Sequence, residues 1–274
     1  METIIKAIQY KVLERLIDQN YEYIKMKIND INSNFIFGRT MSLGKWFEFF
    51  LGEELAKELD RNLILVDTCI TTIKKYPCKN ESAKKQRKSV YADLLILEKI
   101  GKEKLVSIQD DIKDIKKAIR QHNEKVITEN GVSEKGYEVT QFYEVKAIIE
   151  TKIDPGYIKI NDLNDSFQRM NDFINNKEGF TFKKQVQFPN GKEDFLQNFL
   201  FFNPDNIQKF LVLSTEANHA ERVESIRELC DKEGYKYISL TDSSIHIRSI
   251  RRGDKNWEKI MNRKKDELFS ELAD

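Results

Sequence analysis

Residues Val90–Leu97 (VYADLLIL) form an almost unbroken apolar run with one carboxylate, Asp93, inside it. A run of this length, in which apolar and polar residues do not alternate, is typical of a strand buried on both faces of a sheet. A lone buried carboxylate is costly unless it is paired, protonated or bound to a metal. The run therefore predicts an α/β fold with a covered sheet. In it, Asp93 either binds a metal or has a structural partner, such as Arg87 or backbone amides at a strand end.

A second apolar run, Phe142–Ile149 (FYEVKAII), carries an acid and a base. Side chains alternate across a strand, so Glu144 and Lys146 point to the same face and place a carboxylate beside an ammonium. The structural alternative is an ion pair on a half-exposed sheet. Glu150 and Lys152 repeat the pattern further along the same face. We favour Glu144 and Lys146 because their flanks are more apolar and because Glu150 lies close to a Pro-Gly turn.

Helix-like and strand-like patterns surround these runs in a definite order. Helices are expected where apolar residues recur at helical spacing, with Ser42 as one N-cap and Gly234 after one C-terminus. The expected helices are 2–33, 42–60, 162–175, 218–232 and 255–272, and the further strands are 63–66, 69–73, 210–213 and 237–240. The stretch 176–206 has no clear pattern.

No internal repeat or obvious linker divides the chain, so residues 1–274 are predicted to form a single domain. Its parts are a helical N-terminal extension (1–40), a core (42–240) with a helical insertion near 108–128, and a C-terminal helix (250–274). The apolar stripes of 2–33 and 108–126 are most simply core-facing, but they are narrow enough to form a dimer seam instead.

Composition limits the partner and the compartment. The 46 Lys and Arg residues nearly balance 45 Asp and Glu, so a nucleic-acid surface has to come from local patches. Three scattered cysteines and three histidines indicate neither a disulfide framework nor a zinc site. An apolar signal core and a run of membrane-spanning length are both missing. We therefore expect a soluble, cytoplasmic protein without a membrane partner.

Two basic clusters are candidates for contacts with a phosphate backbone. One precedes the Asp93 strand and the other follows the last expected strand. A solvated loop is the structural alternative for each of them. Their members are Lys84, Lys85, Arg87 and Lys88 in the first, and Arg248, Arg251 and Arg252 in the second.

Two carboxylates on adjacent strands, with a lysine beside them, suit phosphodiester hydrolysis. Carboxylate oxygens hold Mg²⁺, which polarises a phosphate and lowers the pKa of a bound water. A lysine whose pKa is depressed by the site could orient or deprotonate the attacking water, or neutralise the developing charge. No glycine-rich phosphate loop is found, so ATP coupling within this chain is not expected.

The pattern Asp93 … Glu144-Val145-Lys146 resembles the PD-(D/E)XK nuclease superfamily, which includes most type II restriction endonucleases. That family's core is a helix, three strands, a helix, a strand and often a further helix and strand, and this order is expected here over most of the chain. The resemblance implies a restriction-endonuclease-like central mixed sheet flanked by helices. It also implies that Asp93 and Glu144 bind Mg²⁺ and that Lys146 is the catalytic lysine.

The family often adds an acidic residue from the first core helix. On a helical wheel, Glu48 falls within the apolar stripe of the 42–60 helix, whereas Glu53, Glu54 and Lys57 fall on the opposite side. Glu48 is therefore a candidate third metal ligand. The alternative is that the aliphatic part of its side chain packs on the core while its carboxylate reaches solvent.

The expected function is that of a Mg²⁺-dependent DNA endonuclease, most simply a type II restriction enzyme that cuts double-stranded DNA as a homodimer. A repair, phage or other defence nuclease of the same superfamily is the nearest alternative, and a non-catalytic DNA-binding module is the alternative from another class. If residues 105–109 formed the third strand, Glu144 would be misassigned.

Overall fold

The computed structural model describes the chain in two compact units. The described residues are 1–29, 36–71, 89–101, 103–104, 139–153, 158–175, 178–181, 185–188, 192–194, 197–215 and 220–241. The chain is mixed α/β, with helices packed on the strands of a mixed sheet. None of the described helices is long and apolar enough to cross a membrane.

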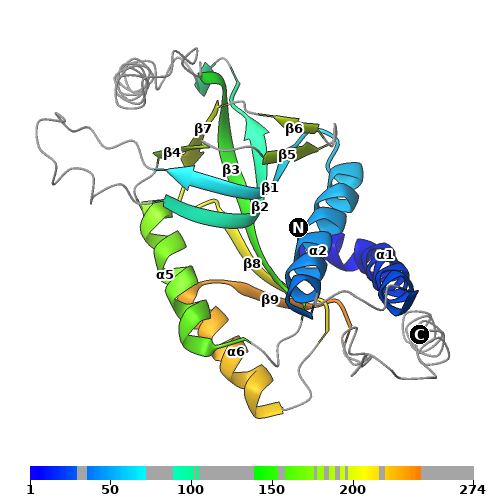
Figure 1. Ribbon diagram of the computed structural model, residues 1–274. Helices are drawn as coiled ribbons and strands as arrows, with labels where there is room; N and C mark the ends of the chain where they lie inside the picture. Colours follow the sequence, from blue (N-terminus) through cyan, green and yellow to red (C-terminus); the bar gives the residue numbers. More distant parts are fainter. Residues whose placement is uncertain are drawn as a thin grey trace, which may run out of the picture. The chain divides into compact units, whose positions relative to one another are not determined.

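The first unit comprises residues 1–60, 149–166 and 209–274. Its helices α1 (Glu2–Asn29) and α2 (Ile36–Glu58) lie side by side (Figure 1). The apolar stripe at the start of α1 is buried, at Ile5, Ile8, Val12 and Leu16. For these positions the prediction of a core-facing helix is confirmed.

Three strands of this unit pair in the order β3-β8-β9. They are the part of β3 (Val139–Lys152) from Ile149 onward, β8 (Gln208–Leu213) and β9 (Lys236–Ser239). Strands β8 and β9 are parallel and are joined by helix α6 (Ala220–Glu233), which ends before Gly234 at a φ of 72°. The predicted C-terminal β-α-β unit and the helix-ending role of Gly234 are confirmed.

The second unit comprises residues 61–148 and 167–208. It holds β1 (Leu63–Thr71), β2 (Ser89–Lys99), the first part of β3, β4 (Glu178–Thr181), β5 (Gln185–Phe188), β6 (Lys192–Asp194) and β7 (Gln197–Phe202). The strand order is β6-β5-β1-β4-β7-β3, and β2 pairs with both β1 and β3. The pairings β1–β2–β3–β7–β4–β1 therefore close into a ring. Strands β3 and β7 are parallel, while β1 is antiparallel to β2, β4 and β5.

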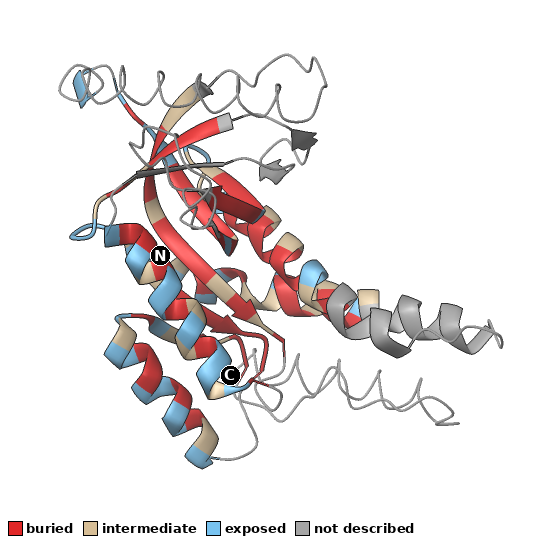
Figure 2. Ribbon diagram, turned by 60° about the vertical axis from the view of Figure 1, so that its left-hand side comes forward, coloured by how far each residue is buried: buried red, intermediate tan, exposed pale blue. Residues whose placement is uncertain are grey.

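The core of the second unit lies between these strands and the end of helix α5 (Ile160–Asn175), which begins in the first unit. Figure 2 shows strands β1, β2 and β3 buried over much of their described length. Side chains from β1, β2, β3, β7 and α5 meet in this cluster, which includes Leu65, Leu95, Val145, Phe173 and Leu200. The prediction that β2 is buried on both faces is confirmed for Leu94, Leu95, Ile96 and Leu97, which are all at most 1% exposed, whereas Tyr91 is 53% exposed.

Several boundaries differ from those expected. Helix α2 begins at Ile36, so Ser42 lies inside the helix and is not its N-cap, and the expected start of the core near residue 42 falls within α2. The two short strands expected before and after Asp67 are one strand, β1. The unassigned stretch 176–206 holds β4 to β7. The insertion near 108–128 and the helix at 250–274 lie outside the described residues.

Candidate active site

Asp93 lies in the middle of β2, where it is half-buried between buried Ala92 and Leu94. The ladder with β1 pairs Val66 with Leu94 and Thr68 with Ala92, so the residue facing Asp93 is Asp67. Asp67 is exposed and has a φ of 52°, the left-handed region that side chains other than glycine rarely adopt. Two aspartates therefore occupy facing positions between two pairs of buried residues.

In both strands, the alternation of side chains between the two faces of the sheet is interrupted near Asp67 and Asp93. Regular alternation sends every second side chain to the same face. On β1, Leu65 and Ile70 both join the apolar cluster although they are five positions apart, and on β2 Ala92 and Leu95 both join it although they are three apart. The alternation is thus broken in both strands around Asp67 and Asp93. Sequence reasoning missed Asp67, and its only signal was the gap between two short apolar stretches.

Glu144 and Lys146 lie on β3 and form an ion pair, with Lys146 Nζ 3.2 Å from Glu144 Oε2. Lys104, which lies in a helical turn after β2, places its Nζ 2.6 Å from the same oxygen. Burial raises the pKa of Glu144, but the hydrogen bonds and charges of Lys104 and Lys146 outweigh it and hold that pKa below its ordinary value. Glu144 is therefore a buried carboxylate bound by two ammonium groups.

Lys146 also contacts Glu98 of β2, with Nζ 2.9 Å from Glu98 Oε2. The hydrogen bond to Glu98 raises the pKa of Lys146; burial opposes this, and Glu144 adds to the increase. The expectation that the pKa of this lysine is depressed is therefore wrong for the chain without ligand. Lys146 is a cation shared by two carboxylates, and it can neutralise charge but is a poor base.

The β2 residue beside the Glu144–Lys146 pair is Glu98, and not Asp93. The amide of Ile100 donates to the carbonyl of Phe142 over 3.1 Å, which places the end of β2 along residues 142–146 of β3. Asp93 precedes Glu98 by five positions, about 16 Å at roughly 3.3 Å per residue of extended strand. Asp93 and Glu144 are thus not brought together. Glu98 follows the apolar run, so its place beside Lys146 gave no sequence signal.

The second acid–base pair of β3, Glu150 and Lys152, is also formed. Lys152 Nζ lies 2.6 Å from Glu150 Oε1, and the carbonyl of Lys152 accepts a hydrogen bond of 3.1 Å from the amide of Ser214. Buried Tyr235 lies close enough that the charge of Glu150 adds to the effect of burial in raising the pKa of its phenol. This end of β3 is thereby fixed within the first unit.

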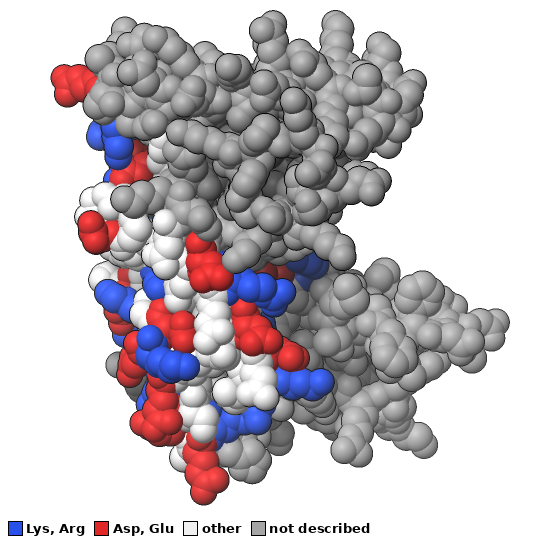
Figure 3. Space-filling view, turned by 90° about the vertical axis from the view of Figure 1, so that its left-hand side faces the viewer, with Lys and Arg blue, Asp and Glu red and all other residues white. Residues whose placement is uncertain are grey.

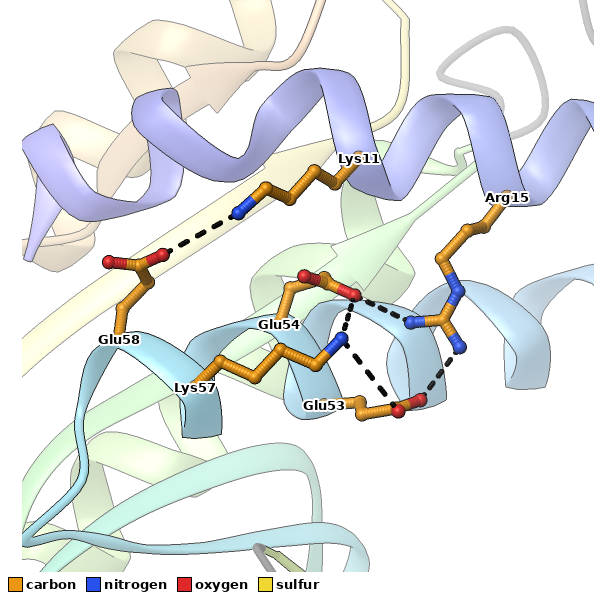
Figure 4. A network of polar contacts seen from close by, with 6 residues as sticks. All are labelled: Lys11, Arg15, Glu53, Glu54, Lys57 and Glu58. Atoms are coloured by element: carbon orange, nitrogen blue, oxygen red, sulfur yellow. Dashed lines mark hydrogen bonds and ion pairs between the residues drawn. The ribbon is translucent and has the colours of Figure 1, made fainter.

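Glu48 of α2 is 6% exposed, so the prediction that it faces inward is confirmed. Its carboxylate binds Lys45, with Nζ 2.8 Å from Oε2. Glu54, which the helical wheel places on the opposite side of α2, is buried as well, at 3% exposed. Helix α1 covers that side, and Arg15 Nη1 lies 2.8 Å from Glu54 Oε1 (Figure 4).

The remaining predicted residues can be placed only in part. The residues of both basic clusters, namely Lys84, Lys85, Arg87, Lys88, Arg248, Arg251 and Arg252, lie outside the described residues. On the face shown in Figure 3, the described acidic and basic side chains are interspersed and no patch of one sign is formed. Within the described part of the chain, no three His, Cys, Asp or Glu side chains are grouped so that they could hold a metal ion.

Comparison with known proteins adds no relative to this picture. The chain matches no protein-family model, and comparison with curated proteins and with solved structures finds no significant similarity.

Proposed function

We propose that this chain is a Mg²⁺-dependent nuclease that hydrolyses phosphodiester bonds in double-stranded DNA, most simply as a type II restriction endonuclease. The observation that carries the proposal is the position of Asp93. It is half-buried between the buried residues Ala92 and Leu94 of β2, and its position faces a second aspartate on β1. The neighbouring strand, β3, carries two acid–base pairs with the Glu-x-Lys spacing.

The order of elements supports the same proposal. Helix α2, strands β1, β2 and β3, helix α5, strand β8, helix α6 and strand β9 follow one another as the resemblance to PD-(D/E)XK nucleases requires. The four short strands β4 to β7 are added between α5 and β8. A repair, phage or other defence nuclease of that superfamily would have the same order.

The donor set suits Mg²⁺, because the candidate ligands are carboxylates and Mg²⁺ prefers oxygen ligands while keeping several waters. Bound Mg²⁺ would supply Lewis-acid activation of the phosphate and of a water. Asp93 and a glutamate of β3 would hold it, with Glu48 as the candidate third carboxylate. The lysine of the acid–base pair would neutralise the charge that develops on the phosphate.

Two glutamates of β3 compete for the ligand role. Glu144 is bound by two ammonium groups and lies beside Glu98, about five strand positions from Asp93. Glu150 is bound by the ammonium of Lys152, and its side chain is 14% exposed against 9% for Glu144. We retain both pairs as candidates, with Asp93 about five strand positions from the level of Glu144, and the variants below decide between them.

The test is cleavage of a panel of plasmid and genomic DNA, with Mg²⁺ and with EDTA. Wild type is compared with Asp93→Asn, Glu144→Gln and Glu150→Gln, and Glu58→Gln on the surface of α2 is the matched control. We expect cleavage that EDTA abolishes, that Asp93→Asn reduces by at least about 100-fold and that one glutamate variant reduces equally. The glutamate that matters identifies the pair. Discrete fragments would support a restriction enzyme, and a smear would favour another nuclease of the superfamily.

A non-catalytic DNA-binding module is the second candidate. The ion pairs of Glu48, Glu144 and Glu150 favour it, because carboxylates that are paired with lysines can serve to stabilise the fold and not to bind a metal. If wild type binds DNA but cleaves no substrate in the panel with Mg²⁺, the nuclease proposal fails and this module is the better description.

A further inference from the structure

We propose that Arg15 of α1 is a positioning residue that fixes the middle turns of α2 and, with them, Glu48. We call Arg15, Phe50, Glu53 and Glu54 the α1–α2 clasp. Only the consequence for metal binding rests on the proposed function, because it requires that Glu48 contributes to the Mg²⁺ site.

One guanidinium makes all the contacts of the clasp, and Figure 4 shows those to Glu53 and Glu54. Arg15 Nη2 lies 2.7 Å from Glu53 Oε2, and Nη1 lies 2.8 Å from Glu54 Oε1. The same group lies over the ring of Phe50, with Cζ 4.2 Å from the ring centroid. Arginine is planar and offers a rigid fork of donors, so it can hold two carboxylates and stack on a ring at once, which the point charge of lysine cannot do. The three partners lie within about one turn of α2.

The clasp contains one buried carboxylate, Glu54, whereas the charge pair between Lys11 and Glu58 is exposed. The side chain of Glu54 is 4% exposed, and Lys57 Nζ lies 2.6 Å from Glu54 Oε1. Burial raises the pKa of Glu54, but Lys57 and Arg15 outweigh it and hold that pKa below its ordinary value. By contrast, Lys11 and Glu58 are 54% and 44% exposed and lie 3.7 Å apart. Removing Arg15 would take one of its two cationic partners from the buried carboxylate of Glu54, whereas removing an exposed charge matters little.

The clasp acts on the turn that carries Glu48. Phe50 follows Glu48 by two positions and stacks on Trp46, with ring centroids 5.3 Å apart and planes at 28°. Glu48 has a side chain that is 8% exposed and tied to Lys45, so its carboxylate moves with the helix. A displaced or mobile α2 would therefore displace this carboxylate, and a ligand displaced by about 1 Å greatly weakens a metal site.

The experiment compares Arg15→Met, Arg15→Lys and two controls in the full-length protein. Lys11→Met removes the exposed charge pair, and Ile8→Val trims the buried side of α1 without touching the clasp. Amide hydrogen exchange over residues 43–54 is measured first. We expect exchange to be at least about threefold faster in both Arg15 variants and unchanged in Lys11→Met. The Mg²⁺ concentration that half-saturates DNA cleavage is measured next, and we expect a rise of about 10-fold in Arg15→Met and no rise in Ile8→Val.

Unchanged exchange over residues 43–54 in Arg15→Met would overturn the proposal. Faster exchange with an unchanged Mg²⁺ requirement would show that the clasp holds α2 but not the metal site, and the part concerning Glu48 would fall. If wild type cleaves no DNA, the proposed function fails and takes the role of Glu48 with it. Hydrogen exchange then still decides whether Arg15 fixes α2.

Discussion

Asp67 and Asp93 occupy facing positions on β1 and β2, between the pairs Val66–Leu94 and Thr68–Ala92. Like charges directly opposite each other weaken a sheet, and Asp67 adds a left-handed backbone at the same position. Two features that cost stability therefore coincide with a half-buried carboxylate in the middle of β2. Such a combination is expected at functional sites, where local strain is maintained by the surrounding structure.

The backbone of Asp67 gives the first prediction. A left-handed conformation costs about 1–2 kcal/mol for residues with a Cβ, and glycine avoids this cost. We expect Asp67→Gly to be more stable than Asp67→Ala by about 1 kcal/mol, with Asp67→Asn between them because asparagine tolerates this region. Urea unfolding of the three variants measures the difference. Equal stability of the alanine and glycine variants would contradict a positive φ at this position.

The second prediction concerns the pH dependence that Glu144 contributes. Its pKa in the folded chain lies below the ordinary value of 4.5, so its ion pairs stabilise the fold above about pH 4.5 and are lost as the pH falls through the lowered pKa. We expect Glu144→Gln to lower the free energy of unfolding by about 1–3 kcal/mol at neutral pH. This difference from wild type should shrink below about pH 4.5, as followed by urea unfolding across a pH series. A difference that does not change with pH would contradict the ion pairs with Lys104 and Lys146.

The third prediction concerns Lys146, whose pKa is raised mainly by its hydrogen bond to Glu98. A raised lysine pKa stabilises the fold below the ordinary value of 10.5, and this contribution is lost as the pH rises through the folded pKa. We expect Glu98→Gln to lower the pKa of Lys146, measured by NMR titration of its side chain. Glu58→Gln, which removes an exposed carboxylate from α2, is the control and should leave that pKa unchanged. An unchanged pKa in Glu98→Gln would mean that the contact is not maintained in solution.

The sequence was sufficient for the elements of the fold but not for how they pair. Apolar runs and helical periodicity located α2, β2, β3, α6 and β9, because burial on one or two faces leaves a direct record in the sequence. Short strands pairing at a distance leave a weaker record, so β4 to β7 were not recognised. The register of a strand also depends on partners far along the chain. The register of β2 on β3 places Glu98 beside Lys146, so Asp93 and Glu144 do not lie together as expected.

The burial and contacts of the charged residues could also be predicted only in part. The helical wheel placed Glu48 inward, because it lies among leucines, and Glu54 on the opposite side of α2, but it gave no sign that this side is also buried. Helix α1 covers this second face, where Arg15 of α1 and Lys57 of α2 compensate the buried carboxylate of Glu54. Similarly, neither the contact of Glu98 with Lys146 nor the position of Asp67 opposite Asp93 could be predicted from the spacing of residues alone.

The last prediction separates a functional Asp93 from a structural one. If Asp93 is a structural partner that holds β2 in place, Asp93→Asn should lower the free energy of unfolding by about 1–3 kcal/mol, as the loss of a buried charged hydrogen bond does. If Asp93 instead binds a metal, its charge matters for the bound ion and not for the fold. We therefore expect Asp93→Asn to change the free energy of unfolding by less than about 1 kcal/mol, measured by urea unfolding in EDTA. Wild type should also gain stability when Mg²⁺ is added, because a ligand that binds only the folded chain stabilises it, and Asp93→Asn should not. A variant that is less stable in EDTA while wild type gains nothing from Mg²⁺ would identify Asp93 as structural.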